Sequence, residues 1–171
     1  MPLIMLQLKN LPDAKILEKF VARYPDAEVE AVLPFLNILR AGSDLSDALD
    51  ALLAKHGLLQ GRWWVLILLM REDNLTSTPS DLAEKAGVSR ATMTGLIDGL
   101  EREGLVQRLA DAVDRRKFSI RLTEDGQQKL DAVMPDYYRK VRNLMEVLAI
   151  PQRDQLVSHL KCLTANIQAL G

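Results

Sequence analysis

Hydrophobic residues recur along most of this chain at steps of three and four, the spacing that places them on one face of an α-helix. The first such stripe follows Asp13, a residue type suited to capping a helix, and continues to Tyr24. It predicts a short helix. An apolar arm over residues 3–8 precedes this helix and needs a packing partner.

A second stripe runs from Val32 to Leu53 and predicts a long helix that stops before Gly57. Pro34 fits this helix only in its first turn, because proline cannot donate the backbone hydrogen bond that an interior position requires. Residues 62–71 are apolar nearly all round, so we expect a helix buried in a core rather than one at a surface.

The middle of the chain carries the signals of two short helices joined by a tight turn. Thr78 suits an N-cap and Pro79 the first helical position. Gly87 then suits a helix stop, and Ser89 suits the cap of the next helix. Two helices joined by a glycine-containing turn of about three residues have the spacing of a helix-turn-helix, whose second helix enters the DNA major groove.

The second of these helices, predicted over residues 90–103, has an unusual polar face. Its apolar stripe consists of Met93, Leu96, Ile97 and Leu100. Its opposite face carries short side chains or none, at Ala91, Thr94, Gly95 and Asp98. A merely solvated helix would carry longer polar residues there, so we expect another surface to come close to this face.

Alternation of apolar and polar residues replaces the helical spacing after Gly104. The segments "LVQRLA" and "KFSIRLT" alternate as half-buried strands do, around the polar loop "DAVDRRK", and predict a two-stranded wing. Between residues 105 and 123 five basic residues (Arg108, Arg115, Arg116, Lys117 and Arg121) stand against two acidic ones, Asp111 and Asp114.

The last third of the chain is helical again. Its first stripe, from Leu130 to Leu148, predicts a helix with a kink or a local break at Pro135. Pro151 opens a final helix, whose apolar residues follow a heptad seam: Leu156, Leu160, Leu163, Ile167 and Leu170. Such a seam suits a partner helix better than water, so we expect a homodimer whose interface joins both ends of the chain.

Composition refines this interpretation. A chain of 171 residues with 48% hydrophobic content suits one domain, with or without an attached oligomerisation region. The net charge of -1 requires any nucleic-acid contact to come from a local basic patch. One cysteine excludes an internal disulfide, and neither a secretory signal nor an apolar run of membrane-spanning length is present, which predicts a cytoplasmic protein.

Three segments, in this order and spacing, resemble the winged helix-turn-helix regulators of the MarR family (multiple antibiotic resistance regulators). They are "SDLAEKAGVSRATMTGLIDGLEREGLVQR", the loop "DRRK" and the following "IRLTEDG". The resemblance covers roughly residues 30–170. It implies an obligate dimer, a palindromic operator, repression by occlusion, and often an aromatic or phenolic ligand between the DNA-binding lobe and the dimer helices.

We therefore expect a mainly α fold with a small β-wing. Residues 59–123 are predicted to form the winged helix-turn-helix DNA-binding lobe. Residues 1–58, with the arm and first helices, and residues 124–171, with the last helices, are predicted to form a helical dimerisation region.

The resemblance assigns DNA contacts to the start of the second helix. It places Arg90 and Thr94 near base edges, Thr92 at the groove margin and Ala91 against a thymine methyl. Gly95 departs from the family, which often carries a larger and frequently basic residue there. A small-residue face lets the helix backbone lie deep in the groove and favours reading of DNA shape.

Two serines and the wing supply the remaining predicted DNA contacts. Ser80 and Ser89 are placed to bind phosphate, with the alternative that both only cap helices. In the family the arginine two positions after the wing aspartate, here Arg116, enters the minor groove. The neighbouring Arg115 and Lys117 complete this predicted site, with the alternative that the cluster is a solvated turn.

A ligand cleft is a further expectation, lined by Arg40, Arg62, Trp63, Trp64 and Tyr137. Core packing is the alternative for at least one tryptophan. Cys162 suits a small packed hydrophobe better than an oxidation sensor. His159 and Cys162 supply only two metal ligands where zinc needs three or four, so we expect no metal and no cofactor.

The sequence thus predicts a transcriptional regulator that acts as a repressor. Its expected partners are double-stranded DNA, a second copy of itself and a small aromatic effector, and no membrane is expected. A winged-helix module that binds only proteins is the alternative. An enzyme is not expected, because the two histidines, His56 and His159, lie near no nucleophile elbow and no carboxylate pair marks a site.

Overall fold

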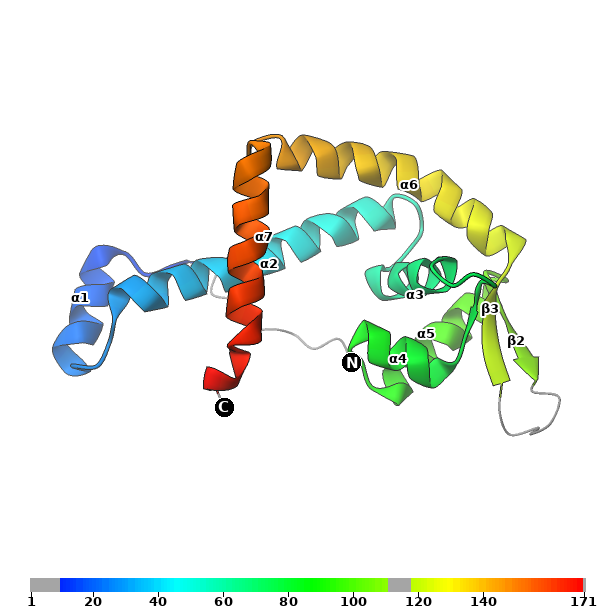
Figure 1. The fold of residues 1–171 in the computed structure, drawn as a ribbon, viewed down its shortest axis with the longest axis horizontal. Coiled ribbons are helices and arrows are strands. Elements are labelled where there is room, and N and C mark those ends of the chain that lie inside the picture. The colour runs from blue at the N-terminus through cyan, green and yellow to red at the C-terminus, as the bar shows by residue number, and fades with distance from the viewer. Residues whose placement is uncertain (1–9, 111–117, 171) are drawn as a thin grey trace. The chain divides into compact units, whose positions relative to one another are not determined.

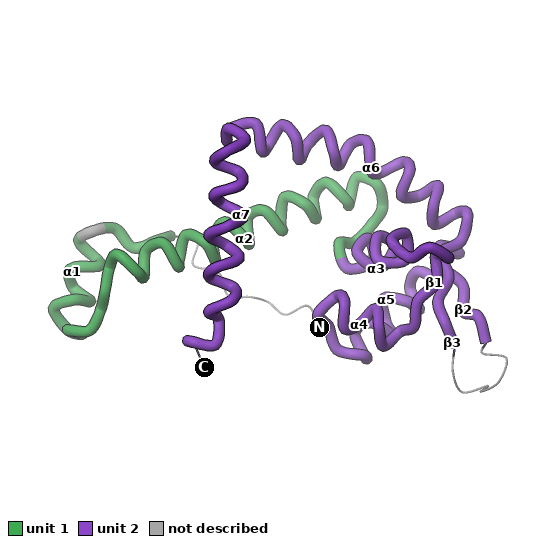
Figure 2. The backbone as a smooth tube through the Cα atoms, in the orientation of Figure 1, with its two compact units in different colours: residues 1–60 green, residues 61–171 purple. Residues whose placement is uncertain are grey.

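The computed structural model describes residues 10–110 and 118–170. The chain divides into two compact units, Met1–Gln60 and Gly61–Gly171 (Figure 2). Seven α-helices, three strands and a short 3-10 helix make up the described chain, which confirms the mainly α fold with a small β-sheet. The predicted apolar arm over residues 3–8 lies outside the described residues.

The first unit contains two helices, α1 (Ala14–Arg23) and α2 (Val29–Ala54) (Figure 1). The carboxylate of Asp13 accepts a hydrogen bond of 2.8 Å from the Ile16 amide and so caps α1 as predicted. Gly57, in a left-handed conformation with φ of 66°, follows the end of α2, which confirms the predicted stop.

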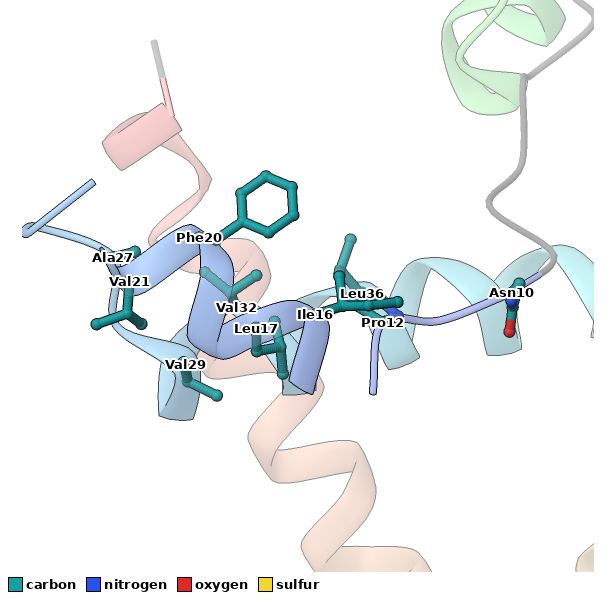
Figure 3. Close-up of a pocket in the computed structure, with 10 residues that line it drawn as sticks. All are labelled: Asn10, Pro12, Ile16, Leu17, Phe20, Val21, Ala27, Val29, Val32 and Leu36. Atoms are coloured by element: carbon teal, nitrogen blue, oxygen red, sulfur yellow. The ribbon is translucent and has the colours of Figure 1, made fainter. Parts of the chain in front are cut away.

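The position of Pro34 differs from the prediction. Because α2 begins at Val29, the proline lies in the second turn of the helix and not in the first. The earlier start places Val29 within the helix, beside α1. Residues of the first two turns of α2 and of α1 face one another around an apolar cavity of about 410 Å³ (Figure 3), with Val29, Val32 and Leu36 on one side and Ile16, Leu17, Phe20 and Val21 on the other.

The second unit is built around α3 (Gln60–Met70). The predicted core helix is confirmed for its five buried residues, Trp63, Val65, Leu66, Leu68 and Leu69. Trp64 and Met70, by contrast, are more than one-third exposed. The other fully buried side chains of the unit come from the helices and strands that follow, with Leu82, Met93, Ile97, Leu100, Ile120, Leu130 and Val133 as the largest.

The helix-turn-helix consists of α4 (Pro79–Ala86) and α5 (Arg90–Arg102), with the caps that the sequence predicts. The Thr78 hydroxyl accepts a hydrogen bond of 3.2 Å from the Asp81 amide. Gly87 ends α4 at a φ of 65°, a conformation in which a side chain would be strained. The Ser89 hydroxyl accepts one of 3.1 Å from the Thr92 amide and starts α5.

The sheet has three strands rather than the two predicted. β1 (Thr76–Ser77), β2 (Val106–Ala110) and β3 (Phe118–Leu122) lie in the order β1-β3-β2, and both pairs are antiparallel. A two-residue strand is too short for its alternation to be read from a sequence. β1 exists because the long partner β3 offers a free edge to it, and the Leu122 amide continues this pairing to the Leu75 carbonyl at 2.9 Å.

Two helices end the chain. α6 (Glu124–Met145) is capped by Thr123, and it continues through Pro135 without the local break that was one of two expected outcomes. α7 (Ile150–Ala165) follows, with proline in its first turn as predicted. Within the described chain no helix is long and apolar enough to span a membrane.

The heptad seam predicted for the last helix is α-helical only in its first part. α7 ends at Ala165, and Ile167–Leu170 form a 3-10 helix, so the last two seam residues leave the heptad spacing. The amide of Asn166, a residue type common at helix ends, bonds back to the last turn and closes the α-helix there. No residue of α7 is buried within the chain.

Candidate nucleic-acid interface

The N-terminal half of α5 presents a continuous exposed surface. Its exposed residues include all the predicted base-contacting positions and the glycine beside them: Arg90, Ala91, Thr92, Thr94 and Gly95. A β-carbon built at Gly95 would meet nothing within 4 Å. The face with short side chains is therefore open at Ala91, Thr94 and Gly95, as the sequence predicts, whereas Asp98 pairs with Arg108 of the sheet.

Local hydrogen bonds occupy several of the hydroxyl groups on this surface. Thr94 Oγ1 donates to the Arg90 carbonyl at 2.9 Å, and Ser89 Oγ lies 2.9 Å from Thr92 Oγ1. Ser89 thus caps α5, whereas Ser80 is exposed and caps nothing, because Thr78 caps α4. The alternative in which both serines are only caps is therefore wrong for Ser80.

Electrostatics at the start of α5 favour an anion. The first turn of α5 contains no acidic residue, so the positive end of the helix dipole and its free amides are not neutralised there. The Arg90 side chain forms no ion pair with any described residue. A phosphate or a base edge would find unneutralised donors at this end of the helix.

A charged network holds α4 in place beneath this surface. Ser77 Oγ donates a hydrogen bond of 2.6 Å to Asp81, which also binds Lys85 at 2.9 Å, and these contacts hold the pKa of Asp81 below its usual range. Lys85 in addition binds Glu72 at 2.7 Å. The hydrogen bonds to Glu72 and then Asp81 raise the pKa of Lys85.

The basic patch of the wing is smaller than the sequence count suggests. Arg108 forms ion pairs with Asp98 and Glu101 of α5, and its guanidinium lies 5.3 Å from the centre of the Phe118 ring. It is therefore committed to contacts within the lobe and is not a free cation for DNA. The predicted wing residues Arg115, Arg116 and Lys117 lie outside the described residues.

The structure brings together three of the five predicted ligand-lining residues. Trp63 lies 4.6 Å from Trp64 and 4.9 Å from Tyr137, measured between ring centres. These three rings line a cavity of about 340 Å³ between α3 and α6, together with Ile67, Met70, Arg71, Met134 and Tyr138. Trp63 is only 1% exposed, which confirms core packing for one tryptophan.

The two predicted arginines do not belong to this cavity. Arg62 forms an ion pair with Glu103. Arg40 lies on α2 in the other unit and donates a hydrogen bond of 2.6 Å to Asp44, which raises the pKa of Arg40. Arg71 is the cation at the cavity, and sequence reasoning missed it. Its signal was its place seven residues after Trp64, two helical turns along the same face.

The other candidate residues lie on α7. His159 and Cys162 are both exposed in the single chain, so the predicted packing of the cysteine stays a prediction. In the part of the chain that the structure describes, no three side chains of metal-binding type come together.

An exposed helix held in a helix-turn-helix and followed by an antiparallel sheet defines a winged-helix DNA-binding protein (Figure 1). Residues 58–118 match the MarR family model. The HTH-type transcriptional repressor YetL of Bacillus subtilis (strain 168) is 30% identical over 155 residues, which cover 91% of this chain and 93% of that protein. The chain therefore belongs to the MarR family of transcriptional regulators.

Other relatives and solved structures agree. The transcriptional repressor MprA of Escherichia coli (strain K12) is 28% identical, with 85% of this chain and 82% of that protein covered. The crystal structure of AbsC, a MarR family transcriptional regulator from Streptomyces coelicolor, superposes with a TM-score of 0.76 at 24% identity, over 84% of this chain and 97% of AbsC.

A DNA complex is among the similar folds. The S. aureus MepR–DNA complex matches with a TM-score of 0.67 at 20% identity, over 77% of this chain and 94% of that one. As a member of the MarR family, the chain is a DNA-binding regulator of transcription. This is the class that the sequence analysis predicted in preference to an enzyme.

Proposed function

We propose that this regulator acts in the cytoplasm as a homodimer that binds a palindromic operator and represses transcription by occluding the promoter. The open N-terminal half of α5 carries the proposal, because its exposed residues combine an unpaired arginine, small side chains and free helix amides. The relatives YetL and MprA are named as transcriptional repressors, which supports repression rather than activation.

Each predicted contact residue has a proposed role on DNA. Arg90 and Thr94 approach base edges in the major groove, Thr92 lies at the groove margin, and Ala91 packs on a thymine methyl. Ser80 and Ser89 bind phosphates. Of the wing residues, Arg116 enters the minor groove, Lys117 binds phosphate, and Arg115 supports them.

Exposed apolar side chains support the dimer. α7 and the 3-10 helix expose the five seam residues by 38% to 75%, at Leu156, Leu160, Leu163, Ile167 and Leu170. The first unit exposes further large apolar residues, among them Phe20, Tyr24, Phe35 and Leu39. Monomeric proteins rarely leave this much apolar surface in contact with water, so a second copy is the proposed cover for both ends of the chain.

Gel retardation and footprinting on the intergenic DNA beside the gene for this protein test the proposed function. We expect two protected half-sites about one helical turn apart, centre to centre, and affinity that falls steeply as salt rises. A protein that retards no promoter DNA, yet binds a protein partner with little salt dependence, would establish the protein-interaction alternative instead.

An aromatic carboxylate is the proposed effector, bound in the cavity between α3 and α6. Trp64, Tyr137 and Tyr138 supply aromatic walls, and Arg71 forms no ion pair with any described residue. An anion with an aromatic body would pair with Arg71 and pack against these rings.

A further inference from the structure

Two glycines interrupt the recognition helix α5, and they have opposite surroundings. Gly95 is exposed, with open space around it. Gly99 lies one turn further along and is buried against the side chain of Arg62 from α3. A β-carbon at residue 99 would lie 2.5 Å from Nη2 of Arg62 and 2.8 Å from both Cζ and Nε, distances that real structures do not show.

The guanidinium of Arg62 lies on α5 in the space that Gly99 leaves. One turn further along the same face it forms an ion pair with Glu103, the residue that caps the C-terminal end of α5. The Arg62 side chain is 23% exposed and that of Glu103 is 42% exposed, so water screens this pair only partly. Three residues thus join α3 to the recognition helix at a defined position.

A glycine inside a helix needs such a reason, because alanine stabilises a helix interior better. For Gly99 the reason is the arginine that fills the missing side-chain volume. A flat guanidinium can lie against the helix at Gly99 while its Nη1 pairs with Glu103, whereas a lysine ammonium would place only a point charge near Glu103. The contact therefore depends on both the flat guanidinium and the absent side chain.

The opposite flank of α5 is held in a similar way. Arg108 of β2 pairs with Asp98 and Glu101 while it stacks on Phe118. The carboxylates on the C-terminal half of α5 therefore face arginines of the scaffold, one from α3 and one from the sheet. Among the described residues, no ion pair holds the N-terminal half, which meets DNA in the proposed function. Its orientation therefore follows from how the C-terminal half is held.

We propose that Arg62 is a positioning residue for DNA recognition. By filling the space at Gly99 and pairing with Glu103, it sets the angle of α5 and hence the depth at which Arg90 and Thr94 enter the groove. The inference rests on the proposed function in that α5 is taken as the helix that reads DNA. Arg62 itself contacts no DNA in this account.

A double-mutant cycle between residues 62 and 99 tests the contact. Gly99→Ala alone should displace the guanidinium, which is the mobile end of a long side chain, and weaken operator binding about tenfold, within the range of couplings between contacting residues. In the Arg62→Ala background the same Gly99→Ala change should raise the melting temperature and leave operator affinity unaltered. Gly95→Ala is the matched control for melting temperature and should raise it in both backgrounds.

Salt dependence separates positioning from direct contact. Arg62→Ala should weaken operator binding about tenfold and reduce the discrimination between the operator and a half-site variant, with an unchanged salt slope, since no phosphate contact is lost. Arg139→Ala removes an exposed arginine that pairs with Asp136 on α6, and it should leave both affinity and discrimination unchanged. Glu103→Gln keeps the arginine in its space and should show a smaller loss in the same direction.

The outcomes are distinct. If the wild-type protein binds the operator but the effects of Arg62→Ala and Gly99→Ala simply add, the positioning role is wrong and the proposed function stands. A salt slope that falls by about one unit per subunit in Arg62→Ala makes the arginine a phosphate contact and also overturns the inference. If the wild-type protein binds no operator, the proposed function fails and the positioning role fails with it.

Discussion

Single side chains on α5 show how little direct base readout this surface offers. Thr94 donates its hydroxyl proton to the Arg90 carbonyl, so towards DNA it can act as an acceptor or as a methyl contact but not as a donor. Ala91 offers a methyl group and Gly95 no side chain at all. In the proposed function, Arg90 supplies the main direct base contact, and reading of shape by the wing and by a deeply placed helix supplies much of the remaining specificity.

Substitutions in the wing and in α5 should consequently have different effects on operator binding. Arg116→Ala should weaken operator binding by roughly 1 to 3 kcal/mol per subunit, most on sites with A·T-rich flanks, because a narrow minor groove attracts arginine. Thr94→Ala should cost less and change preference at one position within each half-site. Titrations on wild-type and flank-substituted operators check this order; normal binding by Arg116→Ala with operator loss in Thr94→Ala would contradict it.

Lys117 of the same wing tests whether a contact depends on phosphate charge or on the shape of the groove. Lys117→Ala should weaken binding almost equally on all sequences and lower the salt slope by about one unit per subunit, because one phosphate contact is lost. Titrations at several salt concentrations on operator and unrelated DNA measure both quantities. A loss confined to the operator would show that Lys117 reads sequence or shape and not phosphate charge.

Acid should loosen α4 through Asp81. Because the pKa of Asp81 is lowered in the folded protein, its contribution to stability is present above the usual aspartate range and is lost as pH falls through the folded-state pKa, below about pH 4. Asp81→Asn should therefore reduce the fall in melting temperature over that range. Glu84→Gln, on the same helix, is the control; an identical acid profile in both variants would contradict the role of Asp81.

At the scale of elements, the apolar seam of α7 is exposed, and no contact among the described residues of one chain buries it. Leu156, Leu160 and Leu163 follow one another at steps of four and three on a helix without a buried residue. The seam then passes into the 3-10 helix, where its spacing changes. In the proposed dimer, a partner helix that packs on α7 meets this change in spacing after Asn166.

The paired change Leu160→Asp with Leu163→Asp should abolish dimerisation, because it places four charges in one apolar interface. Sedimentation should then show a 19.2 kDa monomer, and affinity for a two-half-site operator should fall with it. Lys161→Glu, between the two leucines, is the control and should remain dimeric. High operator affinity in a demonstrated monomer would contradict the proposed geometry.

At the scale of the whole molecule, the proposed effector cavity and the proposed DNA surface belong to the same compact unit. The cavity between α3 and α6 includes Trp63 and Trp64, which directly follow Arg62 on α3. A ligand that shifts α3 has a physical route to the recognition helix through the contact of Arg62 with Gly99 and Glu103.

Aromatic carboxylates should quench tryptophan fluorescence and weaken operator binding by the same factor by which operator DNA weakens ligand binding, since coupling between two sites is reciprocal. Arg71→Met should weaken the binding of the carboxylate but not the binding of its uncharged amide analogue. Fluorescence titrations with and without operator DNA measure both factors. Quenching without any effect on DNA binding would leave a pocket that plays no part in regulation.

Local physics determined much of this molecule from the sequence alone. The caps at Asp13, Thr78 and Ser89, the stop at Gly87 and the apolar stripe of α5 are properties of short segments, and each was predicted correctly. The helix-turn-helix and the family followed from them. Short-range hydrogen bonds and helical spacing need no knowledge of distant residues.

The tertiary structure decided what depends on residues far apart in the chain. The strand β1 needs the edge of β3, and Val29 at the start of α2 lines a cavity together with residues of α1. The tryptophans next to Arg62 in the sequence led us to predict that it contacts a ligand. In the structure it lies against Gly99, 37 positions later in the chain. No periodicity records such a pairing, because only the folded chain brings the guanidinium and the missing side chain together.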